Sequence, residues 1–422
     1  MNMDFTELLA EKVCPECGRV HRTDVKQIVM GTDVLPKLPG VIAELGDYRN
    51  VVMICDKNTY EVAGRKIETL MSFAKVIVLD PEGLHASEHS VETVLAELPE
   101  TVDLFVAVGS GTVHDITRYT GYGKGIPFVS VPTAASVDGY VSNVAAMTLK
   151  GTKKTVVACA PLAMVADVDI IAEAPLRLTA SGVGDMLGKY TALFDWKLCH
   201  ALTGEYYCPH VVALMEQALE SVTASIDRLK DRDREAILSL VYGLVLSGIA
   251  MQHTGISRPA SGAEHHISHF IEITMPDRCD ALHGEKVGVG LLLVCKLYHE
   301  LVKLSDEQII EGLPEGPFSV TREEVEPIFG ALTEEMLKEN ANDCASAVTR
   351  AKIIETLPLL RQLVEELPTA EQIDSLMCRA NACHCLEDIG LSTEEMIPYL
   401  YVSAPLIRNR LTLMRILRRF AW

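Results

Sequence analysis

Four histidines in the second half of the sequence have a spacing that suits a metal site. His265 and His269 are four residues apart and would share one face of a helix, whereas His266 is rotated from His265 by about 100°. His283 follows in a short turn before an apolar, glycine-rich segment. Two imidazoles and a carboxylate suit Zn²⁺, Ni²⁺ or Fe²⁺ and leave coordination positions open. A single histidine is more often an ordinary core or surface residue, but this grouping favours a metal site.

Asp185 is a candidate for the carboxylate of such a site. It ends the segment SGVGD at residues 181–185, directly before an apolar stretch of helical periodicity. It could equally be the N-cap of that helix, because aspartate is a preferred capping residue. Spacing alone does not join Asp185 to the histidines, and it does not decide whether His265 or His266 is the ligand.

A second group of residues is a glycine-rich turn that could hold a phosphate. The apolar segment 104–108 runs directly into GSGTVHD at residues 109–115, which continues as a helix. Such a turn lets backbone N–H groups approach a pyrophosphate at the positive end of the helix dipole. His114 replaces the third glycine of the GxGxxG pattern, so an ordinary tight turn is the alternative. Asp56, after the segment 51–55, could bind an adenosine ribose or could cap the following helix.

The elements that would position these residues divide the chain into two parts. The first part alternates short apolar, β-branched segments with helix-compatible ones, which predicts a parallel sheet wrapped by helices. After Pro175, apolar residues recur at helical spacing. We therefore predict an α/β, Rossmann-like dinucleotide-binding domain over residues 1–175 and an all-helical, metal- and substrate-binding domain over residues 176–422. We expect strands at residues 51–55, 75–79, 104–108, 127–131 and 164–170, and helices at 186–198, 211–229, 236–251 and 287–304.

Size and charge narrow the class of protein. A chain of 422 residues exceeds the usual size of one domain, so two cores are expected. The formal net charge of −20 repels polyanions and argues against nucleic acid or an anionic membrane as a partner. We find no run of the ~18 apolar residues that a membrane span needs, and the N-terminal segment 1–12 does not resemble a signal peptide. We therefore expect a cytoplasmic protein whose partners are small molecules.

The cysteines are less informative. Twelve cysteines in this length are too dilute for a disulfide scaffold, and the cytoplasm would keep them as thiols. Two local groups could bind a structural metal: Cys14-x-x-Cys17 with His21 nearby, and the segment CHC at residues 383–385. Neither has a second pair at zinc-ribbon spacing, so we expect ordinary thiols at both.

Five separated segments closely resemble the glycerol-1-phosphate dehydrogenases, within the superfamily of iron-dependent alcohol and glycerol dehydrogenases. In chain order they read GSGTVHD, VPTAASVDGYVS, SGVGD, RPASGAEHHISH and ALHGEKVG, and they cover roughly residues 50 to 300. The bacterial branch of the family is the most similar. The resemblance implies a Rossmann-like domain followed by a helical domain, an architecture shared with dehydroquinate synthase.

The resemblance also implies roles for individual residues. It makes Asp185, His265 and His283 the ligands of one divalent ion, Ni²⁺ or Zn²⁺, with Asp185 also close to the substrate. Asp138 and His269 match substrate-contacting positions with a catalytic role. The positions that match contacts to NAD or NADP are Asp56, Gly111, Thr112, Val113, His114, Asp115, Thr133, Ala134, Ala135, Ser136 and Ser142.

The activity that the resemblance implies is hydride transfer between NAD(P) and dihydroxyacetone phosphate, giving sn-glycerol 1-phosphate, in a homodimer. A phosphorylated substrate needs cations in an acidic protein. Arg258 and Lys286 are candidates, although both could be ordinary surface charges. The alternatives are a glycerol dehydrogenase acting on the unphosphorylated polyol, a dehydroquinate synthase-like lyase, whose pattern RPASG-EH does not resemble, and a catalytically silent NAD- or metal-binding protein.

Overall fold

The computed structural model describes residues 5–313 and 319–420. Residues 1–4, which form part of the N-terminal segment considered above, lie outside that range. The chain forms two compact units. The sheet unit comprises Met1–Gly182 and Glu220–Ile256, and the helical unit comprises Val183–Leu219 and Ser257–Trp422.

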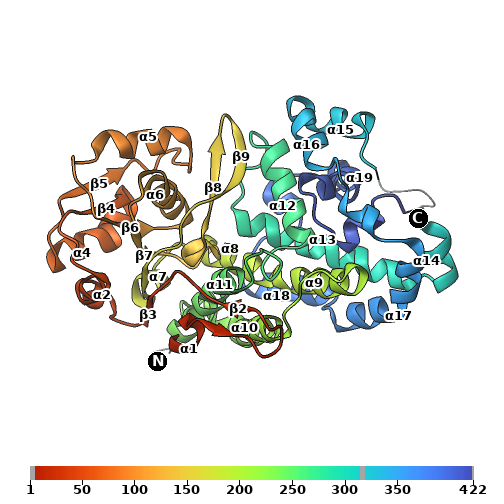
Figure 1. Ribbon diagram of the computed structural model, residues 1–422, viewed down its shortest axis with the longest axis horizontal. Coiled ribbons are helices and arrows are strands. Elements are labelled where there is room, and N and C mark those ends of the chain that lie inside the picture. Colours follow the sequence, from red (N-terminus) through yellow and green to blue (C-terminus); the bar gives the residue numbers. More distant parts are fainter. Residues whose placement is uncertain (1–4, 314–318, 421–422) are drawn as a thin grey trace. The chain divides into compact units, whose positions relative to one another are not determined.

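The core of the sheet unit is a six-stranded, wholly parallel sheet, which confirms the predicted α/β fold (Figure 1). All five predicted strands are present, but the last one ends at Asp167. The Asp167 side chain accepts a hydrogen bond from the amide of Asp169 and so caps a helix where we expected the strand to continue. The spatial order is β3 (Gln27–Gly31), β10 (Ala163–Asp167), β7 (Phe128–Pro132), β6 (Leu104–Gly109), β4 (Val51–Asp56) and β5 (Lys75–Leu79).

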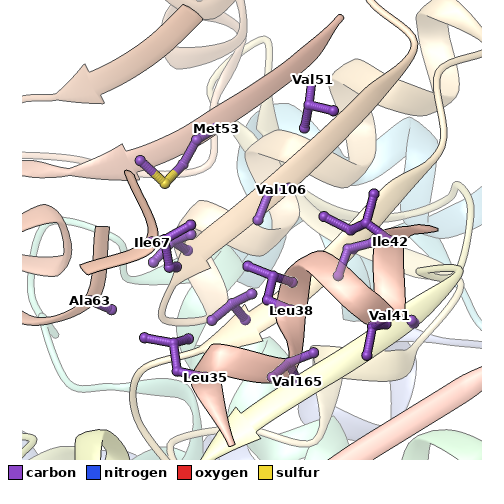
Figure 2. Packing of buried hydrophobic residues seen from close by; sticks show 14 of the residues in the cluster. Leu35, Leu38, Val41, Ile42, Val51, Met53, Ala63, Ile67, Val106 and Val165 are labelled. Carbon is purple, nitrogen blue, oxygen red and sulfur yellow. The ribbon is translucent and has the colours of Figure 1, made fainter. Parts of the chain in front are cut away.

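Alternation along β4 explains how helices cover both faces of the sheet. Val51, Met53 and Cys55 pack on one face, against α2 (Leu38–Leu45) and α4 (Arg65–Leu70), and Figure 2 shows part of this cluster. Val52 and Ile54 face the opposite side, where α5 (Glu88–Glu97) and α6 (Gly111–Lys124) pack. Since successive side chains of a strand point to opposite faces, a strand buried on both faces must be apolar throughout, as β4 is up to Asp56.

Further elements complete the sheet unit. One of them, α11, is long and apolar enough to cross a membrane, but 78% of its most apolar window is buried inside the structure, so it is a core helix here. The two hairpins are antiparallel. The elements are α1 (Thr6–Leu9), β1 (Lys12–Val13), β2 (Val20–His21), α3 (Lys57–Thr59), β8 (Val144–Leu149), β9 (Thr152–Val157), α7 (Val168–Ala172) and α11 (Arg234–Thr254).

The part of the chain described after residue 175 contains helices and no strand, as predicted. Two of these helices cross from one unit to the other: α8 (Leu176–Leu187) and α10 (Pro209–Leu229). In the helical unit α12 packs along α13, and α13 also contacts α9, α17, α18 and α20. The remaining bounds are α9 (Lys189–Thr203), α12 (Ala263–Thr274), α13 (His283–Lys303), α14 (Asp306–Gly312), α15 (Arg322–Phe329), α16 (Thr333–Glu339), α17 (Arg350–Glu366), α18 (Ala370–Arg379), α19 (Thr393–Ser403), η7 (Ala404–Ile407) and α20 (Leu413–Leu417).

Candidate active site

The glycine-rich turn joins β6 to α6 in the sheet unit. Ser110 is the N-cap, its side chain makes no capping hydrogen bond, and the 14-residue helix begins at Gly111. A Cβ on Gly109 would lie 2.7 Å from Val113, and one on Gly111 would lie 3.0 Å from Val137. Packing therefore disfavours a side chain at Gly109 and leaves little room for one at Gly111. The first backbone N–H groups of α6, which have no partner within a helix, are left for an anion.

His114 and Asp115 support this turn from inside. His114 is fully buried, with Nδ1 2.9 Å from the Ser110 carbonyl oxygen and Nε2 2.8 Å from Ser130 Oγ. Burial lowers the pKa of His114 to about 3, so the ring is neutral. Asp115 accepts a hydrogen bond of 2.7 Å from Arg118, which also donates to the Gly139 carbonyl. His114 thus holds the turn at Ser110, whereas Asp115 acts through Arg118 on the segment at Gly139.

The candidate nucleotide contacts gather at one edge of the sheet. Because β4, β6 and β7 are parallel neighbours, Asp56, the turn after Gly109 and the segment from Thr133 onward all follow the carboxyl ends of strands. The amide of Thr133 donates to the Gly109 carbonyl at 3.0 Å. Dinucleotides bind at this edge in doubly wound sheets. Asp56 also caps α3, since its Oδ1 accepts from the amide of Thr59 at 2.9 Å.

The loop that carries Asp138 is anchored within the sheet unit. Asp138 Oδ2 accepts a hydrogen bond of 2.8 Å from Ser247 of α11. Gln252, one turn further along α11, donates to the Val141 carbonyl at 2.6 Å. Ser142 is buried and its Oγ accepts from the amide of Val144 at 3.2 Å. Ser247 and Gln252 were not identified from the sequence, because nothing local marks a polar residue in an apolar helix as a partner of a distant loop.

In the helical unit, three predicted ligands come together. Asp185 of α8, His265 of α12 and His283, the first residue of α13, each offer a ligand atom within 4.8 Å of the other two. His265 Nε2 lies 3.7 Å from Asp185 Oδ1. His266 is buried, stands outside this group, and its ring nitrogens have no hydrogen-bond partner among the described residues. The geometry therefore favours His265 over His266.

Carboxylates behind the two imidazoles fix their orientation. Glu264 Oε1 lies 2.7 Å from His265 Nδ1, and Glu272 Oε1 lies 3.0 Å from His283 Nδ1. Such a carboxylate accepts a hydrogen bond from Nδ1–H, which leaves the lone pair of Nε2 for a cation. Burial raises the pKa of Glu264, while hydrogen bonds from Thr191 and Gly262 act in the opposite direction. The sequence analysis missed both glutamates, although their place on the helix of the histidines was a usable signal.

Lys189 is a further residue that the sequence analysis missed. Its Nζ lies 2.9 Å from Asp185 Oδ1, and both side chains are fully buried. Burial lowers the pKa of His265 well below its usual value, and the charge of Lys189 lowers it further. The cluster thus offers one carboxylate and two imidazoles, ligand types that bind a divalent cation.

His269 lies beside this cluster. Its ring centroid is 5.7 Å from that of His283 and 5.8 Å from that of His265. Burial lowers the pKa of His269 well below its usual value, with Glu272 acting in the opposite direction. His269 therefore lies next to the candidate cation site, where its imidazole can contact a bound substrate.

Of the two cations proposed above, Lys286 lies beside the carboxylate that pairs with His283, whereas Arg258 is held by other partners. Arg258 is buried and donates to the Leu411 carbonyl at 2.6 Å and to Glu205 at 2.8 Å, so its role is structural. Lys286 is buried, 3.5 Å from Glu272. Arg408 follows η7, which packs against α12, and its charge lowers the pKa of His266 and His269. Its guanidinium makes no hydrogen bond or ion pair within residues 5–313 and 319–420.

Comparison with known proteins shows which family the chain resembles. Residues 29–175 match the family model described as iron-containing alcohol dehydrogenase. The protein named glycerol-1-phosphate dehydrogenase (NAD(P)+) from Bacillus licheniformis is 37% identical over 319 residues, which are 71% of this chain and 80% of the relative. The protein of the same name from Geobacillus stearothermophilus is 32% identical over 426 residues, 98% of each chain.

Solved structures give the same fold. A putative alcohol dehydrogenase from Ralstonia eutropha has a TM-score of 0.63 at 18% identity, and the match covers 94% of this chain and 95% of that one. The relatives confirm the resemblance on which the sequence analysis relied. The chain belongs to the glycerol-1-phosphate dehydrogenase family.

Proposed function

We propose that this protein catalyses the NAD(P)-dependent interconversion of dihydroxyacetone phosphate and sn-glycerol 1-phosphate. The observation that supports this most strongly is the buried group of Asp185, His265 and His283 in a chain of this family. The resemblance also motivates a homodimer and a cytoplasmic location. A dehydroquinate synthase-like lyase and a silent binding protein have no observation in their favour.

The donor set fits one divalent cation, Zn²⁺ or Ni²⁺, held by a carboxylate and two imidazoles. When bound, that cation polarises the substrate carbonyl and stabilises the negative charge that hydride transfer from the nicotinamide builds on its oxygen. Glu264 and Glu272 orient the two imidazoles.

The other candidate residues bind and position the reactants. The first turn of α6 binds the pyrophosphate, and Asp56 accepts hydrogen bonds from the adenosine ribose. The segment 133–136 and Ser142 contact the cofactor. His269, which lies beside the cation site, is the candidate proton relay to the substrate oxygen, and Asp138, held by Ser247, binds a substrate hydroxyl.

The stereochemistry of the product tests this proposal. We expect the protein with NADH to reduce dihydroxyacetone phosphate much faster than dihydroxyacetone. We also expect a product that an sn-glycerol-3-phosphate-specific dehydrogenase cannot oxidise. A product that the second enzyme consumes completely would reject the assignment, and preference for the unphosphorylated substrate would favour a glycerol dehydrogenase.

Arg408 is the residue that we expect to bind the substrate phosphate. Replacing Arg408 by glutamine is expected to raise KM for dihydroxyacetone phosphate about thirtyfold, because a hydrogen bond to a charged group contributes about 2 kcal/mol. The matched control is Arg322→Gln, which removes an exposed arginine of the same unit that is paired with Glu334. Steady-state kinetics with dihydroxyacetone as second substrate give the readout. An equal change with both substrates would show that Arg408 does not bind the phosphate.

A further inference from the structure

Two thiols and one imidazole gather in the N-terminal hairpin of the sheet unit. Cys14 Sγ, Cys17 Sγ and a ring nitrogen of His21 all lie within 4.8 Å of one another. Cys17 Sγ is 3.4 Å from His21 Nε2. Cys14 and His21 are buried. None of these residues belongs to the nucleotide turn or to the Asp185 cluster, so the proposed function does not use them.

The backbone of the hairpin brings the two thiols to one side. Cys14 follows β1, its carbonyl accepts from the amide of Gly18 at 2.9 Å, and its amide donates to the Arg19 carbonyl at 2.9 Å. Gly18 has φ 69°, a left-handed conformation that glycine adopts without strain. The chain therefore closes a tight turn between the two cysteines and β2, and His21 on β2 returns opposite Lys12. This C-x₂-C turn with a following histidine offers ligands typical of structural zinc sites.

Little else in the hairpin itself stabilises it. Each strand has only two residues, and a two-stranded hairpin alone is marginally stable in water. Its apolar side chains contribute little burial, since Val13 is 65% exposed and Val20 is 49% exposed. Small elements without a sufficient apolar core commonly depend on a metal or a disulfide.

We infer that Cys14, Cys17 and His21 form a structural site for Zn²⁺, distinct from the catalytic cation site. Thiolates with an imidazole select a borderline-soft cation such as Zn²⁺ over Mg²⁺ or Ca²⁺. A fourth ligand, a further thiolate of the chain or water, completes a tetrahedron. The inference does not rest on the proposed function, because it involves other residues.

The site would stabilise more than the hairpin. The His21 ring stacks on His253 of α11, with centroids 5.0 Å apart. Two residues further, Thr23 donates to Gln252 at 2.8 Å, and Gln252 in turn donates to the Val141 carbonyl. The hairpin and the residues that follow it thus contact the end of α11, and the same end of α11 binds the loop of Asp138.

Cobalt substitution of the full-length protein tests the site. Co²⁺ bound to thiolates gives a sulfur-to-metal charge-transfer band in the near ultraviolet, which the oxygen and nitrogen ligands of the Asp185 cluster cannot give. We expect this band in the wild-type protein and its loss in Cys14→Ser/Cys17→Ser. Mass spectrometry should show that the double variant binds one equivalent of metal less than the wild-type protein. The matched control, Cys383→Ser/Cys385→Ser, removes two thiols elsewhere and is expected to keep the band and the metal.

A second variant distinguishes the loss of metal ligands from misfolding of the hairpin. His21→Cys is expected to keep the band and to strengthen it, since it replaces the imidazole by a third thiolate. X-ray absorption of the zinc-loaded protein counts sulfur neighbours and identifies the fourth ligand. Absence of the band in the wild-type protein, or its persistence in Cys14→Ser/Cys17→Ser, would overturn the inference. Either result leaves the proposed function untouched, because dihydroxyacetone phosphate reduction is measured separately.

Discussion

The variant Asp185→Asn is expected to lose the catalytic cation and about a thousandfold in kcat/KM. The amide cannot supply the negative charge that two neutral imidazoles need beside them to hold a divalent ion. A thousandfold corresponds to about 4 kcal/mol, within the several kcal/mol that a Lewis-acid cation contributes. Metal content by mass spectrometry and steady-state kinetics give the two readouts.

The asparagine is chosen because of Lys189. Either substitution removes the counter-charge of the buried Lys189 ammonium, which lies 2.9 Å from Asp185, but Asp185→Ala would also leave Lys189 without a hydrogen-bond acceptor. Breaking a buried pair in that way costs about 3–5 kcal/mol of stability. Asparagine keeps the shape and an oxygen that accepts a hydrogen bond from Lys189. A fold intact by circular dichroism, with the metal gone, would then separate loss of the ligand from unfolding.

The histidine variants test which side chains bind the catalytic cation. His265→Ala and His283→Ala are expected to lose the cation as well, whereas His266→Ala is expected to keep it. The reason is that His265 and not His266 stands within reach of Asp185 and His283. Stoichiometric metal in Asp185→Asn, His265→Ala or His283→Ala would remove the substituted residue from the ligand set. Loss of metal in His266→Ala with retention in His265→Ala would shift the register by one.

The central strands could be predicted because their signal is local. Residues 51–55 and 104–108 are buried on both faces, so they are apolar throughout and stand out from the amphipathic helices around them. The strand β3 and the hairpin of β8 and β9 were not predicted. In β9 the burial pattern is mixed and two of its residues are lysines, so its sequence lacks the apolar run that marks a strand.

Only the part of the candidate site that lies in recognisable sequence motifs could be predicted. His265 and His269 were visible as a helical pair, but Asp185 joined them through the resemblance alone. Glu264, Glu272 and Lys189 act through contacts between side chains. Their helical spacing from the histidines and from Asp185 was a usable signal, but it does not by itself show these contacts. The segment 220–256 packs with the sheet unit, which helical periodicity could not reveal, because periodicity identifies a buried face and not its partner.

The variant Gly184→Ala is expected to damage the metal site without touching a ligand. Gly184 precedes Asp185 on α8, and a Cβ there would lie 2.2 Å from the carbonyl oxygen of Gly284 and 3.4 Å from the Cα of Gly288. Both neighbours are backbone atoms of α13, so no side chain can move aside. The two helices must separate, and Gly284 directly follows His283.

The close contact at Gly184 sets the expected losses of stability and of activity in Gly184→Ala. Overpacking costs about 1–3 kcal/mol of stability. A displacement of about 1 Å at a catalytic group lowers the rate about a hundredfold. We therefore expect Gly184→Ala to unfold at lower denaturant, to bind the cation more weakly by titration, and to lose about a hundredfold in kcat/KM.

The matched control is Gly123→Ala, in the helix α6, where a Cβ meets nothing within 4 Å. It makes the same chemical change and is expected to stabilise the protein by up to about 1 kcal/mol, because alanine loses less backbone entropy in a helix. If Gly184→Ala instead kept both the stability and the metal affinity of the wild-type protein, close contact between α8 and α13 would not be what positions Asp185 against His283. The ligand set would then have to be aligned by its own hydrogen bonds, those of Lys189, Glu264 and Glu272.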